Sequence, residues 1–308
     1  MTAIRSSIRP VLRRAAQWLA ECGEAAVWDP DLDTGPLTLF AMRYALRPLA
    51  ADDWPDGISE TTRQLAEHLA LCWASQAGQF HDRFISGGFV LPMLAAAVLR
   101  ADDVAAGKVK QICRSEWQKA EAGGAFVAHP TLLWTGRRLL VAMMDDAPTE
   151  QPRPWWSSEV SNLTSRYSIA ASAVRQLVAD VAAMTGYGRF QPPLPTRERD
   201  YLRHTLPFLT FYYVKEQDLD MVCPLLRALR YTGITDVPEY RRAIEFVIGR
   251  SRTDGSFSMR DLAAHLHARS ARPPIDLRRT VHLPLTAASV WALVDCAFPE
   301  RALGHRSG

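Results

Sequence analysis

The apolar positions along most of the chain repeat with the spacing of amphipathic helices. Near the N-terminus they fall three or four residues apart, at Ile8, Val11, Leu12, Ala15, Leu19 and Cys22. This spacing places them on one face of a helix. The same pattern recurs over 65–73 and over 237–248, where Asp236 and Glu239 have the separation of a capping box. No segment alternates apolar and polar residues as a strand does, so we expect an all-α fold.

The periodicity and the Pro- and Gly-rich breaks together predict where the helices begin and end. We expect helices over 8–24, 37–49, 59–77, 85–101, 105–121, 130–145, 157–185, 197–215, 218–232, 237–250, 258–269 and 282–297. The break over 186–195 suggests pseudo-halves of about 1–185 and 196–308. Because the halves do not differ in composition, we expect a single domain over 1–308.

Two segments of nearly equal length resemble each other as helical hairpins. Residues 99–126 and 229–257 each predict helix, turn and helix, and they end in Gly123-Gly124-Ala125-Phe126 and Asp254-Gly255-Ser256-Phe257. Each is followed by an apolar helix that opens with a histidine, His129 or His282. Stacked hairpins leave an apolar face open at each end, so they form a solenoid or close into a ring of inner and outer helices.

The segment 218–257 resembles a repeat of the α/α-toroid superfamily, which includes terpene cyclases, protein prenyltransferase β-subunits and lanthionine cyclases. Repeats of that superfamily often end in Gln-x-x-Asp-Gly-Ser-Trp, and this chain has Ser251-Arg-Thr-Asp254-Gly255-Ser256-Phe257. The resemblance implies antiparallel helical hairpins in an α/α-toroid-like barrel, as in small bacterial members associated with specialised metabolism. It supports the fold more than the function, since one fold hosts many chemistries.

Charge and composition exclude several classes of protein. The 36 Lys and Arg residues nearly balance 33 Asp and Glu, which argues against a nucleic-acid partner. The longest apolar run, Phe89 to Leu99, contains Pro92 and is too short to span a membrane. The five cysteines contain no Cys-x-x-Cys pair, and no apolar stretch follows the N-terminal arginines. We therefore expect a reduced, cytoplasmic protein without disulfides.

Asp218-Leu219-Asp220 is the first candidate for chemistry. Two carboxylates this close raise one pKa and supply a general acid, as the Asp-x-Asp-Asp motif does in class II terpene cyclases. Met221 stands at the fourth position, so the motif is incomplete. The alternative is a helix N-terminus, where Asp caps the first turn, and a second Asp-x-Asp at Asp31 and Asp33 favours it.

Three partial motifs raise the question of a metal ion. Asp52-Asp53-Trp54-Pro55-Asp56 matches the Asp-Asp-x-x-Asp of class I terpene synthases but lies in an expected exposed turn. The second motif of those enzymes begins at Asp145 and Asp146 and fails at Arg153. Cys223, Cys296 and His282 lack the local patterns of the lanthionine cyclase zinc ligands. We expect neither a metal site nor another cofactor.

Two further segments are candidates for the functional site: a polar and aromatic stretch, and a basic insertion. His204, Tyr212, Tyr213 and Glu216 belong either to a cavity wall or to ordinary helix packing. The segment 258–280 interrupts the repeat and is expected to form a basic lid at the rim, or else a solvated helix. Its basic side chains are Arg260, Arg269, Arg272, Arg278 and Arg279.

Two functions follow as expectations. The first is a cyclase-type tailoring enzyme that closes a ring by acid/base catalysis in an enclosed flexible substrate, either an isoprenoid or a modified peptide with zinc-independent thioether closure. The expected catalytic residues are Asp218, Asp220, His282, Tyr212 and Tyr213, and the expected substrate-binding residues are His204, Glu216, Asp254, Arg278 and Arg279. The alternative is a non-catalytic peptide-binding or scaffold protein. Partners would be a peptide or small-molecule substrate and other enzymes of the pathway.

Overall fold

Most of the residues that the computed structural model describes lie in helices. The described residues are 2–28, 34–99, 104–126, 132–133, 135–137, 139–140, 170–188, 194–259 and 281–298. Within these ranges no strand forms, and an isolated bridge joins Ser251 to Phe257. The expectation of an all-α protein is thus confirmed. Among the same residues, none of the helices combines the length and the apolar character that a membrane crossing needs.

The helices mostly follow the predicted ranges. They are α1 (Thr2–Trp28), α2 (Thr34–Leu46), η1 (Ala51–Asp53), α3 (Ile58–Ser75), α4 (Ala77–Arg83), η2 (Phe84–Gly88), α5 (Val90–Val98), α6 (Val104–Ala122), α9 (Ala171–Thr185), α10 (Thr196–Lys215), α11 (Leu219–Tyr231), α12 (Pro238–Gly249) and α14 (Leu283–Ala297).

Some details differ from the sequence predictions, and some of the predicted helices are not described. The helix expected over 85–101 begins at Val90, because Gly87, inside η2, has a φ of 100° and breaks the regular helix there. The capping box at Asp236 and Glu239 does not form: the N-cap of α12 is Val237, and Asp236 instead pairs with Arg203 at 2.8 Å. The helices expected over 130–145 and 157–185 fall partly outside the described residues, and that over 258–269 almost entirely.

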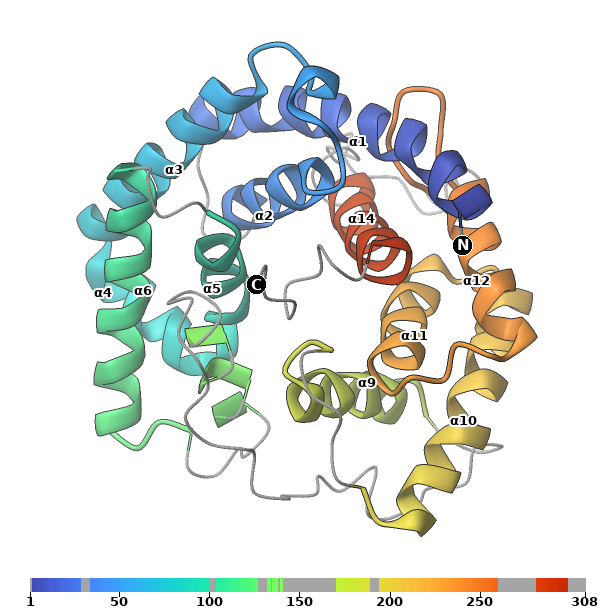
Figure 1. Ribbon diagram of the computed structural model, residues 1–308. Helices are drawn as coiled ribbons and strands as arrows, with labels where there is room; N and C mark the ends of the chain where they lie inside the picture. The colour runs from blue at the N-terminus through green and yellow to red at the C-terminus, as the bar shows by residue number, and fades with distance from the viewer. Residues whose placement is uncertain are drawn as a thin grey trace, which may run out of the picture.

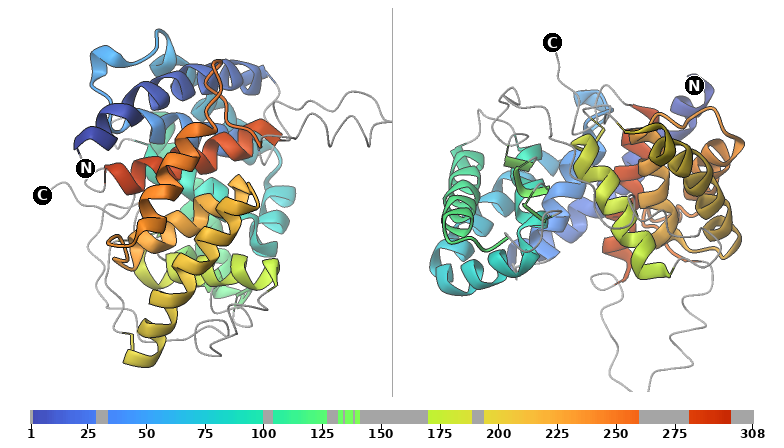
Figure 2. Two further views of the ribbon diagram at one scale, coloured as in Figure 1. Left: turned by 90° about the vertical axis from the view of Figure 1, so that its right-hand side faces the viewer. Right: turned by 90° about the horizontal axis from the view of Figure 1, so that it is seen from below.

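The helices lie in an inner and an outer layer (Figure 1). The inner layer contains α5, α2, α14, α11 and α9, each packed against the next in this order. The outer layer includes α6, α3 and α1 on one side and α12 and α10 on the other, and Figure 2 shows the last two side by side on the outer face. Helix α14, which is close to the C-terminus in sequence, therefore lies between α2 and α11.

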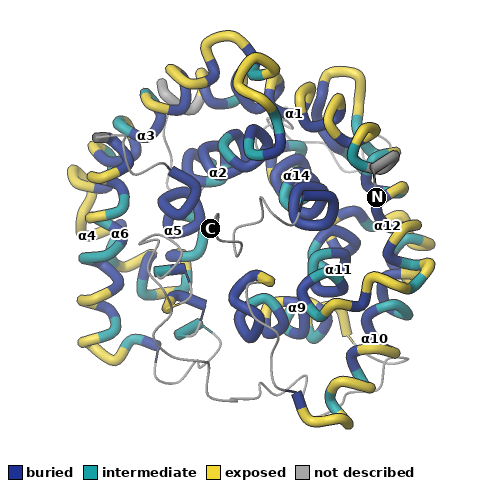
Figure 3. The backbone as a smooth tube through the Cα atoms, in the orientation of Figure 1, coloured by how far each residue is buried: buried dark blue, intermediate teal, exposed yellow. Residues whose placement is uncertain are grey.

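Burial follows the two layers (Figure 3). Outer helix α1 buries its predicted stripe, including Ile8, Leu12 and Leu19, and exposes Arg9 and Arg13 on the other face. Inner helix α14 packs against α1, α2, α11 and α12, so nearly its whole circumference is buried. A helix covered on most sides needs an apolar sequence, and a polar residue there needs a partner.

The two turns singled out by the internal repeat share their backbone conformation. Gly124 and Gly255 have φ values of 71° and 92°, and the phenylalanine two residues later, Phe126 or Phe257, is buried in each case. At Gly255 a Cβ would lie 2.1 Å from the backbone oxygen of Arg14 on α1. Only glycine permits both this φ and this close approach.

Candidate functional site

The structure gives the two carboxylates of the Asp218-Leu219-Asp220 motif ordinary structural partners. Asp218 is the N-cap of α11, and its side chain accepts a hydrogen bond from the backbone N–H of Met221 at 3.1 Å. Asp220 is exposed and pairs with Arg175 of α9 at 3.1 Å. This geometry matches the capping interpretation of the motif.

The predicted polar and aromatic stretch lies on α10, a helix of the outer layer. His204, Glu216 and Tyr212 are exposed, and Tyr213 is buried against Tyr212 with its ring centroid 5.1 Å away. Burial raises the pKa of the Tyr213 hydroxyl, and the negative charge of Asp218 adds to this effect. The stretch thus lies in the outer layer, on a helix that packs against α11 and α12.

Asp254 and His282 hold the second repeated turn. The Asp254 carboxylate accepts hydrogen bonds from the backbone N–H of Ser256 at 3.0 Å and from its hydroxyl at 2.8 Å. Partial burial raises the pKa of Asp254, but these bonds outweigh it and the net pKa is lowered. His282 Nδ1 lies 3.3 Å from the Phe257 carbonyl oxygen. Arg278, Arg279, His129, Asp31, Asp33 and most of the 258–280 insertion lie outside the described residues.

The described residues do not assemble the partial metal motifs. Asp52, Asp53 and Asp56 lie in the exposed turn at η1, and no group of three or more His, Cys, Asp or Glu side chains within the described ranges is arranged to hold a metal ion. The Cys223 thiol lies 3.6 Å from the Ser289 hydroxyl, and the Cys296 thiol donates to the Leu226 carbonyl at 3.7 Å. Burial raises the pKa of Cys223 to about 12, as expected of an inert buried thiol. The motif at 145–153 falls outside the described residues.

The inner layer contains a buried carboxylate that the sequence analysis missed. Asp295 of α14 is 1% exposed. Its Oδ1 accepts a hydrogen bond from the hydroxyl of Tyr44 on α2, and its Oδ2 accepts one from the hydroxyl of Tyr231 on α11. The carboxylate therefore bridges the two helices that flank α14, and both of its oxygens have partners.

A cationic side chain and an indole lie beside this bridge. The guanidinium carbon of Arg227 on α11 is 3.7 Å from the ring centroid of Trp291 on α14. Both residues remain partly exposed. Among the described residues, neither Nε of Arg227 nor Nε1 of Trp291 finds a hydrogen-bond acceptor, although both atoms are buried. We call Asp295, Tyr44, Tyr231, Arg227 and Trp291 the Asp295 cluster.

Two further aromatic rings extend the cluster. Phe40 of α2 meets the Trp291 ring edge-on at a centroid distance of 4.9 Å, and Tyr187, just after α9, stacks on it at 5.8 Å. Tyr187 has a φ of 59°, between Gly186 and Gly188, which are also left-handed. A bulky residue is strained in this region. The strained turn thus brings a ring from the end of α9 onto a tryptophan that also contacts α2 and α11.

The positive charges in and beside the cluster outnumber the negative one. Burial raises the pKa of the Asp295 carboxyl, and the hydrogen bonds from Tyr231 and Tyr44 and the positive charges of Arg227 and Arg47 offset this only in part. Two guanidinium groups therefore act on one carboxylate. When Asp295 is ionised, its charge balances that of Arg227 within the cluster, and Arg47 beside the cluster leaves one positive charge in excess, which favours an anionic ligand.

One signal in the sequence could have identified Asp295. The segment Leu283–Ala297 is apolar apart from small hydroxyl residues, and Asp295 is its one charged side chain. A lone acid in such a helix predicts a buried, paired carboxylate. Its partners Tyr44 and Tyr231 are 251 and 64 residues away in sequence, and no local pattern indicates them.

The comparison with protein families gives one match. A family described as a domain of unknown function, DUF6895, matches residues 184–285, which is less than half of the chain. The matched region includes Tyr187, Arg227 and Tyr231 and ends before Trp291 and Asp295. No curated protein and no solved structure matches the chain.

Proposed function

We propose that the protein is an α/α-toroid-like binding protein that holds an anionic, partly apolar ligand at the Asp295 cluster. The barrel is supported by the order α5, α2, α14, α11 and α9 along the inner layer, in which a late helix lies beside an early one. The five cysteines are all free thiols, in keeping with a reducing, cytoplasmic location.

The observation that carries the proposal is the pair of unsatisfied donors at Arg227 and Trp291. A buried donor without an acceptor costs about 1–3 kcal/mol, so two of them together are unfavourable. A carboxylate or phosphate oxygen would satisfy them, and Arg recognises both groups well. The rings of Phe40, Tyr187 and Trp291 supply apolar contact for the rest of the ligand.

The same geometry favours binding over acid catalysis by Asp295. A general acid must reach the atom that it protonates. Asp295 is buried, and each of its oxygens already accepts a tyrosine hydrogen bond. Its role in this proposal is to fix Tyr44 and Tyr231 and to provide part of the charge that faces Arg227.

Calorimetric titration with three probes tests this function: phenyl phosphate, benzoate and inorganic phosphate. We expect phenyl phosphate or benzoate to bind more tightly than inorganic phosphate, since only they reach the aromatic rings. The variant Arg227→Gln should weaken binding about tenfold or more, because a charge-assisted hydrogen bond is lost. Arg230→Gln, on the same helix, is the matched control. Equal affinity of both variants and the wild type, or no binding of any probe, would overturn the proposal.

The second candidate is the cyclase-type tailoring enzyme of specialised metabolism. It is favoured by the aromatic rings that gather next to the tyrosine hydroxyls and the buried acid. Its substrate would be a modified peptide, closed without zinc to a thioether, or an isoprenoid. Incubation with dehydrated thiol peptides and with isoprenoid diphosphates, followed by mass spectrometry, tests it. Altered thiol or alkene content would support a cyclase, and unchanged precursors would leave only the binding function.

A further inference from the structure

A groove on the outer layer, separate from the Asp295 cluster, has the features of a second ligand site. It lies between α3, α4 and α6 and has a volume of about 690 Å³. That volume is in the range of sites for small molecules. Its apolar lining includes Leu71, Trp73, Ala74 and Phe80. We call it the α3–α6 groove.

The apolar character of the groove reaches the surface. Leu71 is 66% exposed, the highest value among the large exposed apolar side chains of the described residues. Deeper in the groove, Trp73 and Phe80 are buried and stack with ring centroids 4.7 Å apart. An apolar chain laid along this wall would remove Leu71 from water and contact the two rings.

One residue of the lining has a buried donor without an acceptor. Trp73 is 1% exposed, and its indole Nε1 has no hydrogen-bond partner in the described part of the chain. Trp117, on the facing helix α6, shows the usual arrangement, in which Nε1 donates to Glu121 at 2.9 Å. The unsatisfied indole of Trp73 points to a ligand that supplies an acceptor atom.

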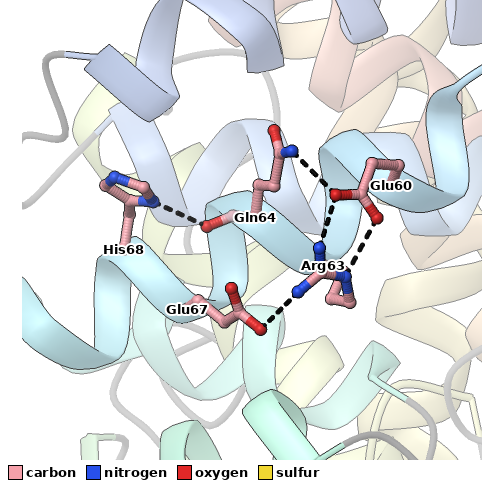
Figure 4. A network of polar contacts seen from close by, with 5 residues as sticks. All are labelled: Glu60, Arg63, Gln64, Glu67 and His68. Atoms are coloured by element: carbon pink, nitrogen blue, oxygen red, sulfur yellow. Dashed lines mark hydrogen bonds and ion pairs between the residues drawn. The ribbon is translucent and has the colours of Figure 1, made fainter.

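The charges around the groove decide the sign of the ligand. The two acidic residues of the lining are already paired: Glu67 with Arg63 at 2.6 Å (Figure 4), and Glu116 with both His81 at 2.7 Å and Lys119 at 2.6 Å. Lys108 of α6 also lines the groove, and within the described ranges it makes no ion pair. Gln111 and Ser115 of the lining can donate or accept, whereas the Trp73 indole and the Lys108 ammonium, which have no partner in the described part of the chain, can only donate.

We infer that the α3–α6 groove binds a small amphiphile with an apolar chain and an anionic head group, such as a medium-chain carboxylate. The chain lies along Leu71, Ala74 and Phe80, and the head group accepts hydrogen bonds from Trp73 Nε1 or Lys108. An anionic head group is favoured over a cationic one because both glutamates of the lining already have basic partners, Glu67 sharing Arg63 with Glu60, whereas Lys108 makes no ion pair within the described ranges.

Three probes with the same chain length separate the contributions of head group and tail: decanoate, decanol and decyltrimethylammonium, each below its micelle concentration. Titrations are followed by ¹H–¹⁵N spectra of indole-labelled full-length protein. The Trp73 resonance is identified by its absence in Trp73→Phe, which keeps the stacking on Phe80. We expect decanoate to bind most tightly and to shift the Trp73 resonance. Equal binding of decanoate and decyltrimethylammonium, or an unshifted Trp73 resonance at saturation, would overturn the inference.

Two pairs of variants complete the experiment. Lys108→Gln should weaken decanoate about tenfold and leave decanol unchanged, whereas Lys110→Gln, on the same helix but outside the groove, should affect neither. Leu71→Glu should weaken decanoate and decanol, and Phe211→Glu, at an exposed ring on α10, should not. Leu71 and Phe211 are both exposed, so we expect the two glutamate variants to fold. If Lys108→Gln and Lys110→Gln behave alike, the anionic head group has no support.

Discussion

The guanidinium carbon of Arg227 lies 3.7 Å from the centre of the Trp291 ring, and each side chain contributes a buried nitrogen that has no acceptor among the described residues. A stacked arginine is held in place by the ring, so less conformational freedom is lost when a ligand binds. The buried carboxylate next to the pair anchors the three helices around it. Its removal gives the first prediction.

Asp295→Ala should lower the free energy of unfolding by about 3–5 kcal/mol, because two buried tyrosine hydroxyls lose their acceptor and two guanidinium groups lose their counter-charge. Asp220→Ala removes a half-exposed carboxylate whose partner is Arg175, and it should cost less than about 1 kcal/mol. Urea denaturation of both variants provides the comparison. Similar losses in the two variants would show that Asp295 does not hold the inner layer together.

The raised pKa of Asp295 predicts a pH dependence of stability. The folded state binds this proton more tightly than the unfolded chain does. The resulting stabilisation is present below the ordinary aspartate pKa of about 4 and is lost as the pH rises through the raised folded pKa. Over that window wild type should lose stability relative to Asp295→Asn, which cannot titrate. A difference between the two that is constant with pH, measured by denaturation at a series of pH values, would refute the raised pKa.

The tyrosine hydroxyls should differ in importance according to their acceptors. Tyr231→Phe removes a hydrogen bond to a carboxylate and should cost about 1.5–3 kcal/mol. Tyr240→Phe removes a hydrogen bond to a neutral acceptor, the Cys296 carbonyl oxygen at 3.2 Å, and should cost about 1 kcal/mol. Thermal unfolding of the two variants measures both losses of stability. A larger loss for Tyr240→Phe than for Tyr231→Phe would contradict this prediction.

Two glycines of neighbouring segments should respond in opposite directions to substitution by alanine. Gly255→Ala should cost about 2 kcal/mol or more, because φ is 92° and the new Cβ would meet the Arg14 backbone oxygen. Gly249→Ala, at the end of α12 with no atom within 4 Å of a Cβ, should stabilise by about 0.5 kcal/mol. Calorimetric melting curves should show a lower melting temperature than wild type for Gly255→Ala and a higher one for Gly249→Ala. A tolerated Gly255→Ala would show that the second repeated turn does not approach α1 as described.

The helices could be predicted from sequence because their signals are local. The apolar stripe of α1 and the glycine turns at Gly124 and Gly255 depend on residues a few positions apart. Helix α4 was missed because it is a single short segment between α3 and η2. The Asp295 cluster depends instead on which helices meet across the inner layer, and periodicity carries no information about that. The Asp218 motif illustrates the converse, since a capping aspartate and a catalytic one look alike in sequence.

The central claim is that Arg227 and Trp291 together donate to an anionic ligand. The most direct measurement is a titration of full-length protein with phenyl phosphate, monitored through the ¹H–¹⁵N resonances of Arg227 Nε and Trp291 Nε1, each assigned by its absence in Arg227→Lys or Trp291→Phe. Our account predicts that both resonances shift downfield together and saturate at the same phenyl phosphate concentration. Resonances that stay unchanged in the folded protein up to millimolar phenyl phosphate, or that respond independently of each other, would contradict it.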